Sequence, residues 1–409
     1  MDALEILMAL GAPAGRANPY PHYAALHELG EAVRPAPGMV IVVGYDAINS
    51  VLRDPDFRAG DEASWERNFP AWREQPVMVQ GADWLLNING PRHARIRSLI
   101  ARAFTARRVA GLEPAIAAIA DGLLDVMAAR GADGSAVEFM HEFAYLLPVT
   151  VICELLGIPE SDREEFRPLA RDLTGIFEFS DPESLPVINA AAIDLLAYFT
   201  GLAATRRAEP RDDLVSDLLA VSDRGDGRLT DAELLHNLTL LLVAGFETTT
   251  NLLGNGVLAL LRNPGELALL QQDPSLVRGA VEELLRYDSP LQFAARLARE
   301  DVELDGRTLR AGQRAVLLLG SANHDPAEFS DPDRLDVRRQ DQRHVAFGFG
   351  MHFCLGAGLA RAEAQIALDT LVRRLPGIAL GADPPVRRPS IALRGLSSLP
   401  VEFEPRRAH

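Results

Sequence analysis

The chain contains little sulfur and few aromatic side chains. Only Cys153 and Cys354 are cysteines among its 409 residues, and aromatic residues make up 6%. A disulfide framework needs more cysteines, so we expect two free thiols and a reducing, cytoplasmic environment. The chain also lacks Ser/Gly-rich linkers and internal repeats. We therefore expect one domain spanning residues 1–409.

Positive charge is also scarce. The chain has no lysine, and its 41 arginines are outnumbered by 57 acidic residues, which gives a formal net charge of −16. This balance argues against nucleic-acid binding through a general positive field. Residues 1–30 lack a basic segment followed by an apolar one, and no apolar run is expected to reach the length of a membrane span. We therefore expect neither a signal peptide nor a membrane anchor.

Helical patterns dominate the rest of the sequence. The 48% hydrophobic content is enough for a large core, and the order of the patterns predicts a mainly α fold with a small β portion. The expected segments are a helix over 21–31, a strand over 39–43, irregular chain over 58–90, successive helices over 91–201, a helix over 276–287, strands and turns over 291–320 and 391–404, and a last helix over 354–374.

One predicted helix is unusually long. The run Thr230-Asp231-Ala232-Glu233 is a capping box, in which the first and fourth side chains satisfy free amides at a helix start. The apolar pattern then continues to Arg262, where Asn263-Pro264 stops it. At 1.5 Å per residue, the helix would be roughly 48 Å long.

A glycine-spaced loop leads into the last predicted helix. It reads Phe347-Gly348-Phe349-Gly350-Met351-His352-Phe353-Cys354-Leu355-Gly356. A helix start presents free amides and partial positive charge, which stabilise the thiolate form of Cys354. Gly348 and Gly350 allow tight turns and close approach to a flat ligand. An isolated cysteine would more often be an inert core residue, which is our expectation for Cys153.

The middle of the long helix carries a second unusual segment, Ala244-Gly245-Phe246-Glu247-Thr248-Thr249. The two small residues leave room for a diatomic ligand and a flat macrocycle. Thr248 follows Ala244 by four residues, so its hydroxyl can bond that carbonyl and bend the helix. Glu247 is ionisable within a very apolar stretch, where an acid must be paired or functional. Without other signals, a core helix with a paired acid would explain the segment.

Together the two segments resemble the signatures of cytochrome P450, a family of haem-thiolate monooxygenases. The cysteine loop has every fixed position of Phe-Gly-x-Gly-x-His-x-Cys-x-Gly, including Gly348 and Gly356. The resemblance implies a haem b cofactor with Cys354 as the axial iron ligand. It also implies that Phe347 packs near the sulfur and that His352 donates to a haem propionate.

The helix segment is similar to the family motif Ala-Gly-x-(Asp/Glu)-Thr-Thr. By that resemblance, Ala244 and Gly245 lie against the haem. Glu247 and Thr248 form the acid–alcohol pair that relays protons to dioxygen. This pair favours dioxygen chemistry over a haem-thiolate enzyme that uses only peroxide.

Weaker matches add further haem contacts and a structural cluster. His93 and Arg97 are four residues apart on one helix face, and by resemblance they reach the propionates, as does Arg296. Glu283 and Arg286 match the Glu-x-x-Arg helix of the family. The remaining member of the cluster is expected to be Arg334, in Pro332-Asp333-Arg334-Leu335.

The substrate pocket can be placed only by family position, and its residues could equally be core. They are largely apolar. The expected wall residues are Trp84, Leu242, Val243, Phe246, Leu291, Gln292, Phe293 and Leu396.

The resemblance also implies partners and a fold. We expect the triangular, mostly helical P450 fold, as a monomer. The chain has no flavin or iron–sulfur segment, so electrons should come from a ferredoxin and its reductase. Arg92, Arg95 and Arg102 are candidates for the surface that binds an acidic ferredoxin.

The expected reaction is hydroxylation or epoxidation of a polyketide or macrolide-type compound. The arginine-rich, lysine-free composition resembles actinobacterial enzymes of secondary metabolism. Terpenoid, fatty-acid or carrier-bound amino-acid substrates, oxidative C–C coupling and dehydration remain open. A cofactor-free helical binding protein is the alternative from another class, and it would be colourless.

Overall fold

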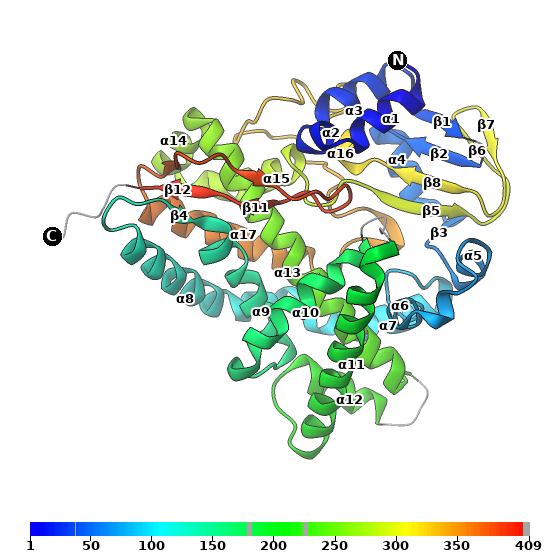
Figure 1. The fold of residues 1–409 in the computed structure, drawn as a ribbon, viewed down its shortest axis with the longest axis horizontal. Helices are drawn as coiled ribbons and strands as arrows, with labels where there is room; N and C mark the ends of the chain where they lie inside the picture. Colours follow the sequence, from blue (N-terminus) through cyan, green and yellow to red (C-terminus); the bar gives the residue numbers. More distant parts are fainter. Residues whose placement is uncertain (37, 178–181, 224–227, 404–409) are drawn as a thin grey trace. The chain divides into compact units, whose positions relative to one another are not determined.

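The computed structural model describes residues 1–36, 38–177, 182–223 and 228–403. The chain forms two compact units, each built from several segments. The first unit comprises Met1–Arg58, Leu112–Leu147 and Thr248–His409, and the second comprises Ala59–Gly111 and Pro148–Glu247. The main sheet lies entirely in the first unit, whereas the second unit consists almost wholly of helices (Figure 1).

The main sheet of the first unit has five strands in the order β1-β2-β8-β5-β3. Strands β2 and β8 are parallel, and the other pairs are antiparallel. The strands are β1 (Ala32–Ala36), β2 (Met39–Val42), β3 (Phe57–Arg58), β5 (Ala294–Ala298) and β8 (Arg314–Leu317). The sequence predicted β2 because its run of β-branched residues fits a strand buried on both faces.

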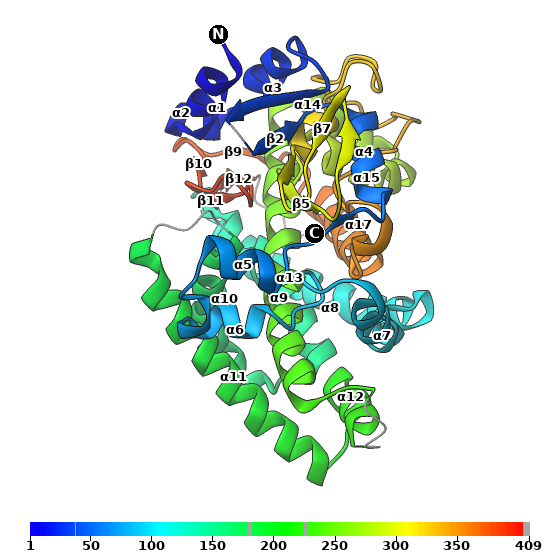
Figure 2. The same ribbon diagram turned by 90° about the vertical axis from the view of Figure 1, so that its right-hand side faces the viewer.

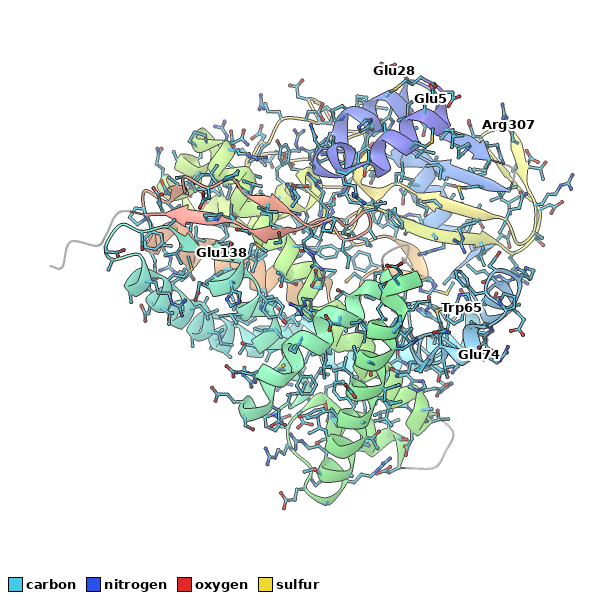
Figure 3. All side chains as sticks on the ribbon, in the orientation of Figure 1. Glu5, Glu28, Trp65, Glu74, Glu138 and Arg307 are labelled. Carbon is cyan, nitrogen blue, oxygen red and sulfur yellow. The ribbon has the colours of Figure 1, made fainter. Side chains whose placement is uncertain are left out.

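Alternation along β2 and β8 sends side chains to two separate cores. Val40 and Val42 pack with residues of α4 (Tyr45–Arg53). Ile41 and Val43 face the other way and pack with α1 (Ala3–Gly11) and α3 (Tyr20–His27). Figure 2 shows these helices on opposite sides of the sheet. The capping box of α1, in which Asp2 and Glu5 satisfy each other's amides, fixes where this N-terminal helix begins; Glu5 is labelled in Figure 3.

The long helix, α13 (Asp231–Arg262), has its C-terminal half in the first unit. The other helices of this unit are α2 (Pro13–Ala17), α8 (Ala106–Arg130, from Leu112 onward), α14 (Pro264–Gln272), α15 (Val277–Tyr287), α16 (Leu319–Ala322) and α17 (Ala357–Arg374). The small strands are β4 (Val137–Glu138), β6 (Val302–Leu304), β7 (Arg307–Leu309), β9 (Ala379–Leu380), β10 (Val386–Arg387), β11 (Leu396–Ser398) and β12 (Pro400–Glu402).

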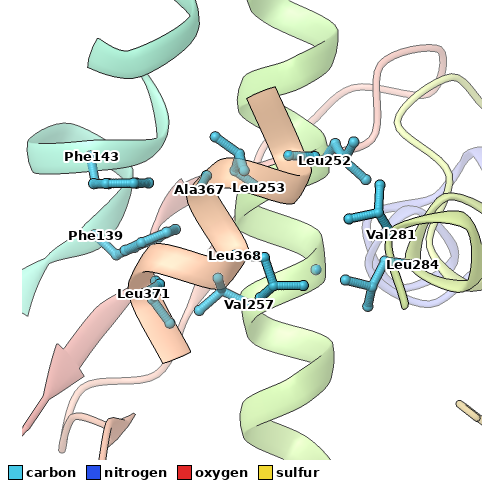
Figure 4. Close-up of a pocket in the computed structure, with 12 residues that line it drawn as sticks. Phe139, Phe143, Leu252, Leu253, Val257, Val281, Leu284, Ala367, Leu368 and Leu371 are labelled. Atoms are coloured by element: carbon cyan, nitrogen blue, oxygen red, sulfur yellow. The ribbon is translucent and has the colours of Figure 1, made fainter. Parts of the chain in front are cut away.

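Small residues let these helices pack closely and leave a cavity between them. A Cβ atom on Gly256 would lie 3.0 Å from Leu284 Cδ1 of α15, so glycine at this position lets α13 and α15 approach without displacing that side chain. Beside it is a small apolar cavity. Its walls are Phe139, Phe143, Leu252, Leu253, Gly256, Val257, Val281, Leu284, Ala364, Ala367, Leu368 and Leu371 (Figure 4).

The second unit contains the remaining helices and the N-terminal half of α13. They are α5 (Glu62–Asn68), α6 (Pro76–Gly81), α7 (Gly90–Ile100), α9 (Leu146–Leu156, from Pro148 onward), α10 (Arg163–Leu173), α11 (Leu185–Ala208) and α12 (Leu214–Ser222). The expectation of irregular chain over 58–90 was wrong, since α5 and α6 lie there. The buried ion pair between Arg206 and Asp213, at 2.5 Å, joins α11 to the cap of α12.

Helix α13 confirms the predicted long helix. Thr230 accepts from the Glu233 amide at 3.1 Å, and the Glu233 carboxylate accepts from the Thr230 amide at 3.1 Å. The helix is continuous for 32 residues and ends at Arg262. Its amino-acid pattern and both end signals were sufficient to place it from the sequence.

Helix α11 departs from one expectation. By length and composition it could cross a membrane, whereas no apolar run was expected to be long enough. Core helices of soluble proteins pass the same test, and α11 buries Ile188, Leu195 and Phe199 within the second unit. Within the helices expected over 91–201, the sequence also predicts an interruption at Asp181-Pro182, but residue 181 lies outside the described residues.

Candidate functional site

Cys354 lies three residues before α17, at the helix start that the sequence indicated. Its amide donates to the Phe347 carbonyl at 3.0 Å, which closes the loop. The Cys354 side chain is exposed, whereas Cys153 is fully buried in the second unit. An accessible sulfur beside free helix amides is suited to thiolate chemistry, and the buried Cys153 is suited to packing.

Two glycines of this loop make the tight turns that the sequence predicted. Gly348 and Gly350 adopt φ angles of 65° and 69°, which side-chain-bearing residues rarely adopt. A Cβ on Gly350 would also lie 2.3 Å from the Leu52 carbonyl oxygen. Gly356 caps α17, and no atom lies within 4 Å of where its Cβ would be. The loop is therefore tightly turned while space remains open next to Cys354.

Phe347 is held by charged residues that the sequence analysis did not single out. The Arg361 guanidinium carbon lies 4.5 Å from the centre of the Phe347 ring. Arg361 binds Glu282 of α15 through two hydrogen bonds, and His344 contacts the same carboxylate. The adjacent acids Glu282 and Glu283 were the available signal. Neighbouring helix positions point in different directions, so two acids there need separate partners.

The predicted cluster on α15 is present, but with a different arginine. Glu283 and Arg286 pair at 2.7 Å, and each has a side chain only 1% exposed. Arg334 was wrongly assigned: its side chain is exposed and pairs with Asp336 at 2.6 Å. Arg339 contacts Glu283 instead, at 3.1 Å. Arg334 contributes only its carbonyl oxygen, which accepts from Arg286 and Arg339, because the turn directs its side chain outward.

The middle of α13 has one accessible stripe in an otherwise buried helix. Leu241, Gly245 and Thr248 are partly exposed and Ala244 is exposed, while Glu247 is only 2% exposed. These accessible positions recur at helical spacing, so they share one face. The two small residues make this face flat enough for a planar group.

Gly245 also has a packing role. A Cβ on Gly245 would lie 2.8 Å from the side chain of Ile152 in α9. The expectation that this glycine leaves room for a ligand therefore describes only part of its function. Its second role is to let α9 and α13 pack closely within the second unit.

Two of the four residues expected to bind the propionates, Arg296 and His93, differ in their surroundings. In the first unit, Arg296 on β5 is partly buried, and burial lowers its pKa to about 10. Within the described ranges, no carboxylate lies within 4.0 Å of Arg296. In the second unit, burial and the neighbouring Arg97 lower the pKa of His93 on α7 to about 4, so this imidazole is neutral at pH 7. The carboxylate of a ligand would offset the buried charge of Arg296.

The expected pocket residues of the second unit are deeply buried. Leu242, Val243 and Phe246 on α13 are at most 1% exposed. Trp84 is 2% exposed and lies 6.2 Å from the Phe177 ring, measured between centroids. The Trp84 indole nitrogen has no hydrogen-bond partner among the described residues. This buried donor is available to a polar atom of a ligand.

In the first unit, the expected pocket residues differ in burial and in whether their polar groups already have partners within the protein. Gln292 accepts from Tyr23 at 2.7 Å and donates to the Ser289 carbonyl at 2.7 Å, so its amide is already used within the protein. Leu291 pairs with Leu393 across a β-bridge, and Phe293 is partly buried. Leu396 on β11 is 3% exposed.

The expected ferredoxin-binding arginines are largely committed to internal ion pairs. Arg92 and Arg95 both bind Glu233, at 3.0 and 2.6 Å. Burial raises the pKa of Glu233, but hydrogen bonds from Arg95, Thr230 and Arg92 lower it to about 2 overall. Arg102 is exposed. Of the three candidates, Arg102 is the one whose charge is best placed to meet a partner.

The described side chains fit a haem with one protein ligand. Cys354 supplies a soft anionic donor beside a helix start. Arg296 supplies a cation, and α13 supplies a flat apolar face with small residues at Ala244 and Gly245. The sequence analysis predicted each of these residues as a haem contact, and each is accessible or partly accessible within its own unit.

Comparison with known proteins agrees with this fit. The cytochrome P450 family model matches residues 195–385. The cytochrome P450 monooxygenase PikC of Streptomyces venezuelae is 42% identical over 399 residues, covering 95% of this chain and 91% of PikC. The mycinamicin IV hydroxylase/epoxidase of Micromonospora griseorubida is 42% identical and covers 88% of each chain.

Solved structures agree as well. That of the Bacillus subtilis bacillaene polyketide synthase cytochrome P450 PksS has a TM-score of 0.86 and 35% identity, covering 96% of this chain and 99% of PksS. Similarity on this scale over nearly the full length establishes fold and family together. The chain therefore belongs to the cytochrome P450 family, and it is a haem-dependent monooxygenase that takes electrons from a redox partner.

Proposed function

We propose that this P450 hydroxylates or epoxidises a polyketide or macrolide-type intermediate of secondary metabolism. The observation that carries the proposal is its similarity to a polyketide synthase P450 and a mycinamicin hydroxylase/epoxidase over most of its length. The largely apolar wall residues are in keeping with a large, mostly apolar substrate. We further propose that both units form one P450 domain that acts as a cytoplasmic monomer.

We assign haem b as the cofactor, with Cys354 as its metal ligand. The cofactor, when bound, supplies the oxygen-activating chemistry. Phe347, Gly348 and Gly356 shape the space around the sulfur, and Ala244 and Gly245 provide a flat apolar face for the haem. His93, Arg97, Arg296 and His352 bind the propionates. The two arginines balance the negative charge of the group, and the two histidines help to hold it through hydrogen bonds.

Glu247 and Thr248 are the proposed proton-delivering pair. Glu247 is 2% exposed, and Thr248 is the partly exposed neighbour on the accessible stripe of α13. A buried acid next to an accessible hydroxyl can pass a proton from the protein interior to the reaction site while bulk water stays excluded. Trp84 and the apolar side chains of α13 orient the substrate and keep the site dry.

The electron donors are proposed to be a ferredoxin and its reductase. Arg92 and Arg95 already hold Glu233 within the second unit. Arg102 is therefore the proposed contact of this group with an acidic ferredoxin.

Substrate class can be tested by titrating ligands into the purified ferric enzyme. Macrolactones and linear polyketide esters are expected to cause a low-to-high spin shift at low concentration, because they displace water from an apolar pocket. Fatty acids, terpenoids and carrier-bound amino acids of similar size serve as comparison ligands. If one of these classes alone produces the shift and a turnover product, the polyketide assignment is wrong while the P450 assignment stands.

Replacing Arg296 with methionine is expected to loosen the haem without damaging the fold. A hydrogen bond to a charged group contributes about 1.5–3 kcal/mol, so haem transfer to excess apomyoglobin should accelerate roughly 10- to 100-fold. The unfolding midpoint of the apoprotein should not fall, because the lost cation has no carboxylate partner in the described ranges. Arg299→Met, at an exposed position just after the same strand, is the control. Equal haem loss in both variants would contradict the role of Arg296.

A further inference from the structure

Three charged or polar side chains meet beside the cysteine loop, on three different segments of the first unit. Arg361 of α17 donates to both carboxylate oxygens of Glu282 on α15, at 2.7 and 2.8 Å. His344, just before the loop, contacts the same carboxylate at 3.1 Å. The side chain of His344 is 2% exposed and that of Glu282 is 14% exposed. We name Glu282, His344 and Arg361 the proximal clamp.

A backbone amide determines which ring nitrogen of His344 donates to Glu282. The Ala346 amide, which can only donate, approaches His344 Nδ1 at 3.2 Å. Nδ1 must therefore accept, and the ring proton lies on Nε2, which donates to Glu282. The Glu282 carboxylate thus accepts from three donor groups, two on Arg361 and one on His344. Burial raises the pKa of Glu282, but the His344 and Arg361 hydrogen bonds lower it to about 2 overall.

The clamp reaches Cys354 through Phe347. The Arg361 guanidinium lies over the Phe347 ring at 4.5 Å, and the His344 ring centroid is 5.9 Å from that of Phe347. The Phe347 carbonyl in turn accepts from the Cys354 amide at 3.0 Å. Arg361 and His344 therefore hold the side chain of Phe347, and the backbone carbonyl of the same residue holds the amide of Cys354.

The proximal clamp is separate from the buried pair next to it on α15. Glu283 binds Arg286 and Arg339, whereas Glu282 binds Arg361 and His344. Successive helix positions diverge by about 100° around the axis, so the two acids serve different neighbours. The Glu283 cluster anchors the chain around residue 334, and Glu282 anchors the cysteine loop.

We propose that the proximal clamp is a positioning device that keeps Cys354 bound to the haem as thiolate. The inference rests on Cys354 being the haem ligand. A bidentate Arg–carboxylate pair has a fixed planar geometry, so it holds Arg361 flat against Phe347 in a way that one flexible charge could not. With the carboxylate removed, Arg361 can turn toward solvent, and the loop that presents the sulfur gains freedom.

The test uses Glu282→Gln and Arg361→Lys in the holoenzyme. Both variants keep a polar side chain of similar size, and Arg361→Lys also keeps the charge. Amide exchange over residues 344–356 is expected to accelerate by about 10-fold or more, because a local hydrogen-bonded unit opens more readily. Over the same period, the ferrous-CO spectrum should lose its red-shifted thiolate band faster than that of the unmodified enzyme.

Arg373→Lys is the matched control. Arg373 lies on the same helix and pairs with Asp369 at 2.8 Å, but both side chains are exposed and far along α17 from the loop. This variant should change neither readout. A double-mutant cycle of Glu282→Gln with Arg361→Gln should show that the second change adds little to the first, because the two residues act as one unit.

The outcomes separate this inference from the assignment of the cofactor ligand. If both clamp variants match the unmodified enzyme in loop exchange and in band stability, the clamp has no positioning role, while Cys354 can still be the ligand. If exchange accelerates throughout the protein rather than over 344–356, the clamp contributes only general stability and the inference is overturned. If a Cys354 variant keeps the thiolate band, the cofactor assignment itself fails.

Discussion

The Cys354→Ser enzyme is expected to lose the red-shifted ferrous-CO band and to show only background monooxygenation. A serine hydroxyl is a far weaker, neutral donor, whereas a thiolate pushes electron density onto iron and favours O–O cleavage. Cys354 is positioned for ionisation by the start of α17 and by the turn that Gly348 and Gly350 make possible. The measurement is the ferrous-CO difference spectrum, together with product formation per electron consumed.

Cys153→Ser is the matched control, because Cys153 is the only other cysteine and is fully buried in α9. This variant should be less stable by a small amount yet keep the pigment and the band, since only packing is altered. A Cys354→Ser enzyme with unchanged spectrum and turnover would remove the basis of the proposed chemistry. Loss of the band in both variants would indicate a general folding defect.

Glu283→Gln is expected to destabilise the first unit by about 3–5 kcal/mol, the usual effect of removing one partner of a buried ion pair. Arg286 would keep its charge in a position only 1% exposed, with one fewer anion to balance it. Its hydrogen bonds to the carbonyls of Asn323 and Pro332 would remain but would not neutralise it. Equilibrium denaturation followed by circular dichroism measures the change in unfolding free energy.

Two arginine variants test the composition of the cluster. Arg339→Gln should destabilise the protein because Arg339 contacts Glu283 at 3.1 Å and is mostly buried. Arg334→Gln should change stability by less than about 0.5 kcal/mol, since the Arg334 side chain is exposed. If Arg334→Gln proved as damaging as Arg339→Gln, the arrangement described here would be incorrect.

The sequence predicted one arginine partner of Glu283 correctly, Arg286, and the other wrongly, since Arg339 takes the place expected for Arg334. Glu283 and Arg286 are three apart on one helix, so local geometry alone predicted their pairing. The other arginine comes from irregular chain, where no periodicity relates sequence position to direction. Only the path of the turn around residue 334 decides which of the nearby arginines faces inward.

The cysteine loop and α13 were predictable because their signals are local. Residue spacing encodes the turn, the helix start and the accessible stripe, and each depends on neighbours within a few positions. The proximal clamp was not found, because its members are distant in the sequence. His344 and Arg361 lie 62 and 79 positions after Glu282. The helices within 58–90 were missed because Gly, Pro and Trp in that stretch obscure the apolar period.

The apolar cavity beside α13 has a consequence for how the first unit responds to compression. Space that atoms do not fill is eliminated when a protein unfolds, and the system then occupies a smaller volume. Hydrostatic pressure is therefore expected to destabilise the folded first unit, in part through the space that Gly256, Ala364 and Ala367 border. Because Ala364 and Ala367 belong to α17, the helix that follows Cys354 is one of the elements that border this unfilled space.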